Sequence, residues 1–362
     1  MKKLTSISTV IIAAILLFTS ACGQTGSPAS GAAPDASVEA ASLSSQAPAT
    51  LETIHIGFPS SGNNYPSGIF GYASELGYLE EYLNPLGYTA QLDGFVGAAP
   101  AIHEALVAKE LDYVVYAGFA SDLAKANGID VTLISIPGWG TNWELVARTN
   151  AGIESIADLK GKKIAYTRGA SPQMYLIKVL AEAGLTFDDI EPINTTIPEG
   201  LAGVVSGSID ATIFVIGQEV DLVASGTVNV IHKGFEADKR TYYEPSVFIA
   251  RTDVYNENKE VAVAIQKAFL KAKDVAKADP DEYFKVTSEK SGLPLDVVLA
   301  TAERDFDVSV PLNLDDIYMD SLKEILDFLH ANELTQGEID FDAWIDGKYA
   351  STKALEEYSG EK

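Results

Sequence analysis

Apolar residues along the first part of the chain follow two alternating spacings, which predict strands separated by helices. Continuous or alternating apolar runs predict strands over Thr53–Pro59, Thr89–Phe95, Leu111–Ala117 and Val131–Ile136. The segments between them have apolar residues at helical spacing and predict helices over Tyr65–Tyr82, Ala98–Ala108 and Ser121–Ala126. This order of elements predicts a mostly parallel sheet with helices on both of its faces.

The same alternation begins again near residue 143. It predicts strands over Trp143–Ala147, Lys163–Thr167, Ile190–Thr195, Ile209–Val215 and Val228–His232, with helices over Ser171–Gly184 and Glu199–Ser206. A further strand over Ser246–Arg251 precedes a sequence that is almost entirely helical beyond Asn256. We therefore predict an α/β protein of two lobes with a ligand cleft between them and two crossover segments as the hinge. One lobe comprises residues 51–142 plus 242–362, and the other comprises residues 143–241.

The N-terminus predicts export. Lys2 and Lys3 precede an apolar, uncharged run, and small residues then lead into Cys22, which is the arrangement of a lipoprotein signal over residues 1–21. The run is shorter than the ~20 residues that a membrane-spanning helix needs, although an uncleaved anchor is the alternative. We expect lipidation of Cys22 and an extracytoplasmic location at the cell membrane.

Composition narrows the functional classes. Residues 22–50 are rich in Ala, Ser, Gly and Pro and predict a flexible linker. Cys22 is the only cysteine, so the mature domain has neither an internal disulfide nor thiol chemistry. The formal net charge of −25 argues against nucleic acid as a partner and against docking to anionic lipids.

Residues that follow the predicted strands are the candidate ligand contacts, because open α/β sheets bind ligands at the carboxyl ends of their strands and small-molecule sites form between lobes. In the first lobe these candidates are Ser60, Ser61, Asn63, Tyr65, Gly118, Phe119, Trp139 and Asn142. In the second lobe, and where the chain returns to the first, they are Arg168, Gly169, Ala170, Ser171, Gly217, Gln218 and Tyr243.

Several of these residues have two interpretations. The loop after the first strand opens a helix whose free N–H groups suit an anion, or it contains ordinary Ser and Asn caps. Phe119 offers a flat apolar wall, whereas Ser121 is a candidate N-cap. Arg168 beside a helix start suits an oxyanion or a surface ion pair, and Ser171 lies at or near the N-cap. Trp139 and Tyr243 either contact the ligand or pack between the lobes. An aromatic or organic anion satisfies the candidate set as a whole.

Four segments resemble a known family: FVGAAPAIHEAL from Phe95, LDYVVYAGFASDLAKANG from Leu111, SIADLKGKKIAY from Ser155 and SIDATIF from Ser208. They resemble the substrate-binding proteins of nitrate, sulfonate and taurine importers, which also include thiamine-precursor-binding proteins. The resemblance implies two Rossmann-like lobes of the periplasmic-binding-protein type II, which close on a ligand held by the strand-end loops. The Trp and Asp-Pro that sulfonate binders usually show near Gly217 are absent, which leaves the ligand class open.

The expected function is therefore that of an extracytoplasmic solute-binding lipoprotein. It would capture a small organic anion or a sulfonate-like aromatic solute and deliver it to an ABC permease, as a monomer without cofactor or metal. A ligand-binding sensor, or an enzyme on the same fold of the thiamine-precursor type, is the alternative. The sequence gives little support to catalysis: His103 lacks the second histidine of a zinc protease at Val107, and phosphate-binding Gly-Lys and Gly-x-Ser-x-Gly motifs are absent.

Overall fold

The computed structural model describes residues 50–361 except Ser61, Asn63, Asn142 and Asp238. The predicted signal and the lipidation site at Cys22 lie outside these residues, as does nearly all of the linker. Among the helices that are described, none has both the length and the apolar character needed to cross a bilayer.

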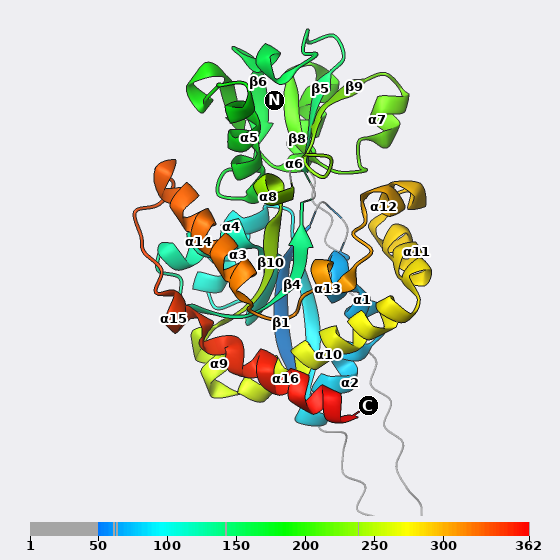
Figure 1. The fold of residues 1–362 in the computed structure, drawn as a ribbon, viewed down its shortest axis with the longest axis vertical. Coiled ribbons are helices and arrows are strands. Elements are labelled where there is room, and N and C mark those ends of the chain that lie inside the picture. Colours follow the sequence, from blue (N-terminus) through cyan, green and yellow to red (C-terminus); the bar gives the residue numbers. More distant parts are fainter. Residues whose placement is uncertain (1–49, 61, 63, 142, 238, 362) are drawn as a thin grey trace, which may run out of the picture. The chain divides into compact units, whose positions relative to one another are not determined.

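The first sheet has the strand order β2-β1-β3-β10-β4 (Figure 1). Its strands are β1 (Glu52–Pro59), β2 (Tyr88–Phe95), β3 (Tyr113–Ala117), β4 (Val131–Gly140) and β10 (Glu244–Arg251). β1 runs parallel to β2 and β3, whereas β10 runs antiparallel to its neighbours β3 and β4. The start of β10 therefore lies at the same edge as the carboxyl ends of the parallel strands, and Ser246 pairs with Ala117 there.

Helices from both ends of the chain cover this sheet (Figure 1). The early ones are α1 (Gly68–Glu75), α2 (Tyr78–Leu83), α3 (Ala98–Val107) and α4 (Gly118–Ala126). The late ones are α9 (Thr252–Glu257), α10 (Lys259–Ala278), α11 (Pro280–Ser291), α12 (Leu295–Thr301), α13 (Phe306–Ser309), α14 (Asp316–Ala331), α15 (Phe341–Trp344) and α16 (Lys348–Glu361). Edge-to-face contacts link Phe58, Phe70, Phe269 and Phe248, so one aromatic core joins the early helix α1 and the late helix α10 to strands β1 and β10.

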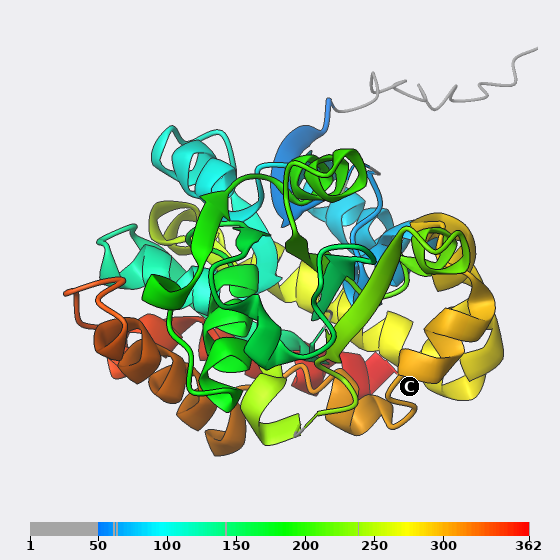
Figure 2. The same ribbon diagram turned by 90° about the horizontal axis from the view of Figure 1, so that it is seen from above.

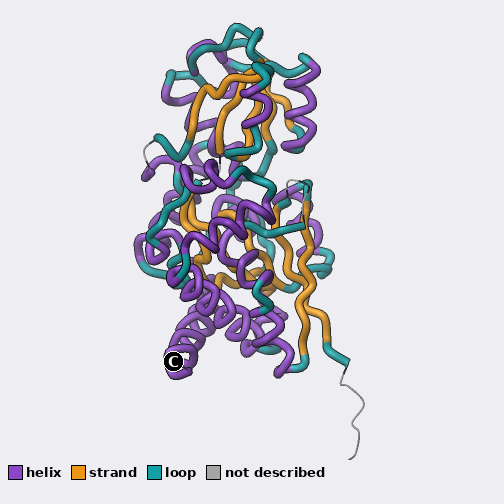
Figure 3. The backbone as a smooth tube through the Cα atoms, turned by 90° about the vertical axis from the view of Figure 1, so that its right-hand side faces the viewer, coloured by secondary structure: helices purple, strands orange, loops and turns teal. Residues whose placement is uncertain are grey.

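The second sheet has the order β7-β6-β8-β5-β9 and forms a separate group of strands (Figures 2 and 3). Its strands are β5 (Trp143–Arg148), β6 (Lys163–Tyr166), β7 (Glu191–Asn194), β8 (Ala211–Val215) and β9 (Val228–Lys233). The helices α5 (Ser171–Glu182), α6 (Ile197–Ser206) and α7 (Val220–Ala224) connect them, and α8 (Lys239–Tyr242) leads back to β10. Leu145, Ile164, Leu176 and Ile213 are fully or almost fully buried in a core that belongs to this sheet.

The structure confirms the predicted α/β class and its two lobes, and it corrects three local predictions. The predicted helix over Tyr65–Tyr82 is two helices, because Gly77 at a φ of +74° breaks the helical path. Residues 137–140 are not a loop but the end of β4, where Trp139 pairs with Pro245. Ser121 is not an N-cap, since α4 already begins at Gly118.

Candidate ligand-binding site

Glu244 joins the two lobes at their strand ends. It is the first residue of β10 and is only 7% exposed. Its Oε2 accepts a hydrogen bond of 3.3 Å from the backbone N–H of Phe119 at the start of α4. The Ser171 hydroxyl at the start of α5 and the Trp143 side chain lie near this carboxylate and act to lower its pKa. A carboxylate of the first lobe thus lies against groups of both lobes.

The electrostatics of Glu244 reflect this position. Burial raises the pKa of its carboxyl group, and this effect exceeds the opposite effects of the hydrogen bonds and of the Lys178 charge. Lys178 lies in α5, where its Nζ donates to the backbone oxygen of Thr241 at 2.7 Å and lies 5.7 Å from the centre of the Phe328 ring. The positive charge near Glu244 is therefore already engaged with other groups.

Asp122 lies one turn further along α4 and is fully buried. Neither of its carboxylate oxygens has a hydrogen-bond partner within the described part of the chain. Burial raises its pKa well above the ordinary value, and the nearby charge of Glu244 raises it further. Two buried acids therefore lie close together where α4 meets β10.

Two acidic residues, Glu144 and Glu219, are also buried in the second sheet, near the start of β5 and the carboxyl end of β8. Trp143 pairs with Val215, so the start of β5 lies at the carboxyl end of β8. Glu144 is 1% exposed and its Oε2 lacks a partner among the residues described. Burial, followed by the charge of Glu219, raises the pKa of Glu144 to about 7. Glu219 itself accepts a hydrogen bond of 2.7 Å from the Gly217 N–H.

The structure brings several of the predicted residues together. Gly118, Phe119 and Ser171 lie around Glu244, and Ala170 is buried with Met174 in the core of the first lobe. A methyl group placed on Gly169 would lie 3.5 Å from Leu123 Cδ2 of α4. The starts of α4 and α5, predicted separately from two strand ends, therefore meet at one point.

Phe119 contributes its backbone rather than its ring. The side chain is fully buried and packs edge-on against Phe328 of α14, with the ring centres 6.5 Å apart. The flat apolar wall expected from the sequence is therefore not presented by this side chain, because the core beneath α14 encloses it.

Trp139 belongs to an aromatic group at the same edge. Its ring packs edge-on against Tyr318 at 5.4 Å and Tyr243 at 6.4 Å between ring centres. Tyr243 also lines a cavity of about 120 Å³ together with Phe235 and residues 300–303. These contacts fit both interpretations of the two aromatic residues, as packing between lobes and as one wall of a ligand site.

The other predicted residues lie apart from Glu244 or are not described. Arg168 is exposed, and its backbone N–H donates to Asn194 Oδ1 at 2.9 Å. Tyr65 is half-buried with a hydroxyl that lacks a partner among the described residues, and Ser60 accepts from the Gly62 N–H. Gln218 is half-buried and follows Gly217 in the turn after β8. Ser61, Asn63 and Asn142 lie outside the described residues.

Gly217 has a structural reason to be glycine. Its φ is +89°, and a methyl group placed on it would lie 2.6 Å from Val297 Cγ1 of α12. We expect Gly217→Ala to lower the free energy of unfolding by about 1 kcal/mol, because a side chain is strained at this φ and α12 must also shift. Urea unfolding measures the loss. Gly226→Ala, at a φ of +71° with open space around it, separates backbone strain from the clash with α12.

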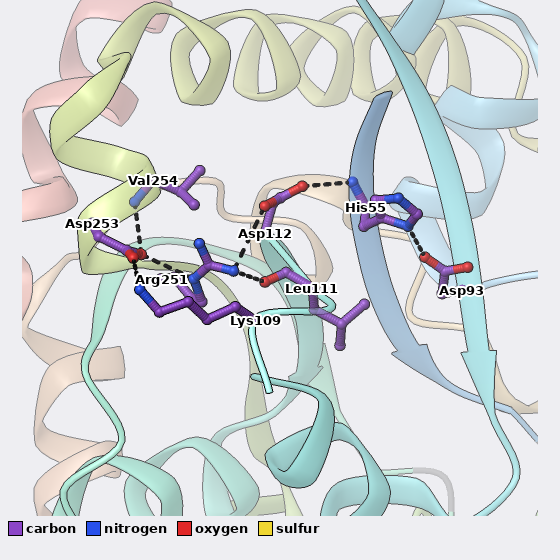
Figure 4. Close-up of polar contacts among 8 residues, drawn as sticks. All are labelled: His55, Asp93, Lys109, Leu111, Asp112, Arg251, Asp253 and Val254. Carbon is purple, nitrogen blue, oxygen red and sulfur yellow. Dashed lines mark hydrogen bonds and ion pairs between the residues drawn. The ribbon is translucent and has the colours of Figure 1, made fainter. Parts of the chain in front are cut away.

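A second candidate site lies along β1 and β2. His55 Nδ1 and Asp93 Oδ2 are 2.9 Å apart (Figure 4). They line a cavity of about 700 Å³ whose other lining residues are Asn64, Gln91, Leu92, Gly94, Phe95, Glu110 and Leu111. Among the residues that the structure describes, this lining includes no serine, threonine, cysteine or lysine, so the described lining offers the His–Asp pair no nucleophile to activate. The Asp112–Arg251–Asp253 contacts beside it tie β3 to β10 and α9.

The sequence analysis missed the acids that define the junction. Asp122 and Glu144 stand inside otherwise apolar helical and strand patterns, where a carboxylate is unusual. Glu244 directly follows Tyr243, and Glu219 follows Gln218. A search for charged residues at positions predicted to be buried would have found the first two.

Comparison with solved structures defines the class of protein as the two-lobed periplasmic-binding-protein fold. The alkanesulfonate-binding protein of Xanthomonas axonopodis pv. citri, bound to MOPS, superposes with a TM-score of 0.64 at 21% identity, over 78% of this chain and 94% of that one. The desulfurization enzyme DSZB gives the same TM-score at 17% identity, over 85% and 99% of the two chains. One architecture therefore serves binding proteins and an enzyme.

The family model described as NMT1/THI5 like matches residues 97–283, and the chain belongs to this family. It is 30% identical over 226 residues to a putative binding protein of Brucella abortus (strain 2308), which covers 62% of this chain and 67% of that protein. It is 24% identical over 202 residues to a putative aliphatic sulfonates-binding protein of Escherichia coli (strain K12). That match covers 56% of this chain and 62% of the relative, less than two thirds of its length.

Proposed function

We propose that this protein is the solute-binding component of an ABC importer and captures a small organic solute where its two lobes meet. The lobes are residues 51–142 with 242–362, and residues 143–241. The observation that carries the proposal is the convergence on Glu244 of Phe119 from one lobe and Ser171 from the other. Groups from two lobes that meet at strand ends form the usual site of ligand capture in α/β folds.

The two crossings between the sheets supply the hinge. One joins β4 to β5 after Gly140, and the other joins α8 to β10 at Glu244. In this proposal the ligand contacts both lobes and therefore stabilises their closed arrangement over an open one. The permease then distinguishes the closed, loaded protein from the open one, while a lipid on Cys22 keeps the protein at the membrane.

We expect a bound ligand to make the mature domain more compact. The chain without its signal and linker should show a smaller radius of gyration in small-angle X-ray scattering once a ligand that raises its melting temperature has been added. Organic sulfonates are the first compounds to screen, because relatives are named for binding them. A bound ligand that leaves the scattering curve unchanged would refute closure of the lobes.

Delivery of the bound solute to the permease requires a separate test. If the neighbouring genes encode a permease and an ATPase, these are reconstituted in liposomes, and the loaded protein should stimulate ATP hydrolysis and uptake of the ligand. A sensor would bind the same ligand without either response. An enzyme would convert the ligand, so recovery of unchanged ligand after incubation separates binding from catalysis.

A further inference from the structure

α12 is packed into the core of the first lobe. Val298 is 7% exposed and lies in that core, and Leu293, Leu299 and Ala302 pack against it. The Ser288 hydroxyl of α11 donates to the Leu293 backbone oxygen at 2.6 Å, which fixes the connection between the two helices. Because a close-packed core transmits displacement rather than absorbing it, α12 moves with the first lobe.

The turn after β8 is fixed to the second lobe. The Gln218 N–H donates to the Val215 backbone oxygen at 3.1 Å, and Glu219 Oε2 accepts a hydrogen bond of 2.7 Å from the Gly217 N–H. Gly217 is buried in this turn at a φ of +89°. The turn, residues 215–219, therefore moves with the second sheet.

α12 contacts this turn at the end of the first lobe that faces the second sheet (Figure 1). A methyl group placed on Gly217 would lie 2.6 Å from Val297 Cγ1 and 3.2 Å from Leu293 Cδ2. Glycine is therefore the residue that allows this approach, and the β-branched Val297 has little rotamer freedom with which to make room. Because each side of the contact belongs to a different lobe, the contact exists only while the lobes are together here.

We propose that Leu293 and Val297 form a clasp, which closes on the Gly217 turn and holds the two lobes together in most of the molecules that carry no solute. This inference rests on the proposed function, because it assigns one contact to the closed arrangement of the lobes. A solute that requires this arrangement binds with an apparent affinity set by the fraction of molecules that are closed. The clasp therefore raises the affinity for such a solute, and residue 217 limits how closely the lobes approach.

Double electron–electron resonance on the mature domain tests the clasp without a ligand. Cys22 is the only cysteine of the chain, so cysteines introduced into a domain without the signal and linker are its only labelling sites. Spin labels at Val223→Cys of α7 and Val308→Cys of α13 report the separation of the lobes, because these side chains are 42% and 43% exposed and belong to different lobes. We expect one predominant short distance for the otherwise unchanged chain.

Disrupting the clasp should separate the lobes. Val297→Asp places a carboxylate in the contact with Gly217. It should lower the ratio of short-distance to long-distance molecules at least about tenfold, because burying an unpaired charge costs more than the apolar contact contributes. Leu295→Asp is the matched control, since it introduces the same charge on the same helix at a side chain that is 40% exposed. It should leave the distances unchanged, and circular dichroism checks that both variants fold.

Gly217→Ala tests the contact from the other lobe. The added methyl group meets Val297, and overpacking by one methyl group should lower the same ratio at least about fivefold. Adding Val297→Ala removes the Cγ atom that the methyl group meets, so the double variant should regain most of the short distance. Gly226→Ala, at a φ of +71° with open space around it, should have no effect. This comparison separates a contact between lobes from backbone strain within a turn.

The outcomes separate this inference from the proposed function. A predominantly long distance in the otherwise unchanged chain overturns the clasp, as does a Val297→Asp variant with the same distances as that chain. Failure of Val297→Ala to rescue Gly217→Ala overturns it too. All three results leave the solute-binding function intact, because solute binding is measured separately by the change in melting temperature. A confirmed clasp in a domain that binds none of the screened solutes supports the inference and counts against the proposed function alone.

Discussion

Replacing Trp344 with alanine is expected to lower the free energy of unfolding by about 4 kcal/mol, the cost typical of removing a buried aromatic side chain. Trp344 has no exposed surface and is the largest fully buried side chain in the described residues. It packs with Phe341 in the core that α14 and α15 share with the first sheet. Its removal leaves a large cavity that the C-terminal segment cannot fill.

Urea unfolding followed by circular dichroism measures this loss. Tyr349→Ala is the matched control, because Tyr349 is an aromatic residue of the neighbouring helix α16 that is 48% exposed. It should change stability by no more than about 0.5 kcal/mol. A loss below about 1 kcal/mol for Trp344→Ala would show that the C-terminal helices contribute little to the core of the first lobe.

The order of elements was predictable because each lobe buries its sheet between helices. Strands enclosed in this way are apolar along their length, and helices such as α3 carry a regular apolar stripe, so both leave a local pattern. The end of β4 was not predictable from local sequence. Residues 137–140 contain two glycines and a proline, and they extend the strand only because β10, about a hundred residues later, pairs with them.

The meeting of two predicted helix starts could be anticipated from the sequence, whereas the groups that lie against them could not. The rule that ligands bind at strand ends led correctly to the starts of α4 and α5 as neighbours. This rule did not indicate that Glu244 would lie against the starts of both helices. That arrangement depends on three segments, far apart in the sequence, meeting in space. The preference for an anion came from counting helix starts and Arg168 as free donors. In the structure the Phe119 N–H donates to Glu244, the Gly169 N–H donates to Gln173, and Arg168 is exposed.

Replacing Glu144 with glutamine is expected to make the protein more stable at pH 8 by about 2 kcal/mol and to change its stability little at pH 5. The pKa shift alone corresponds to about 3 kcal/mol at pH 8, and solvent screening reduces this value. Burial raises the pKa of Glu144 from 4.5 to about 7 in the folded protein. The folded state therefore binds a proton more tightly than the unfolded state, and the stability of the wild-type protein declines as the pH rises from about 4.5 to about 7. Glutamine cannot ionise, so the variant avoids this penalty.

The difference between the two unfolding free energies, measured at several pH values, isolates this one carboxyl group from the many others. Glu191→Gln, on the exposed strand β7, should show no such pH-dependent difference. A Glu144→Gln variant that follows the wild type at every pH would show that Glu144 acquires a counter-charge in solution.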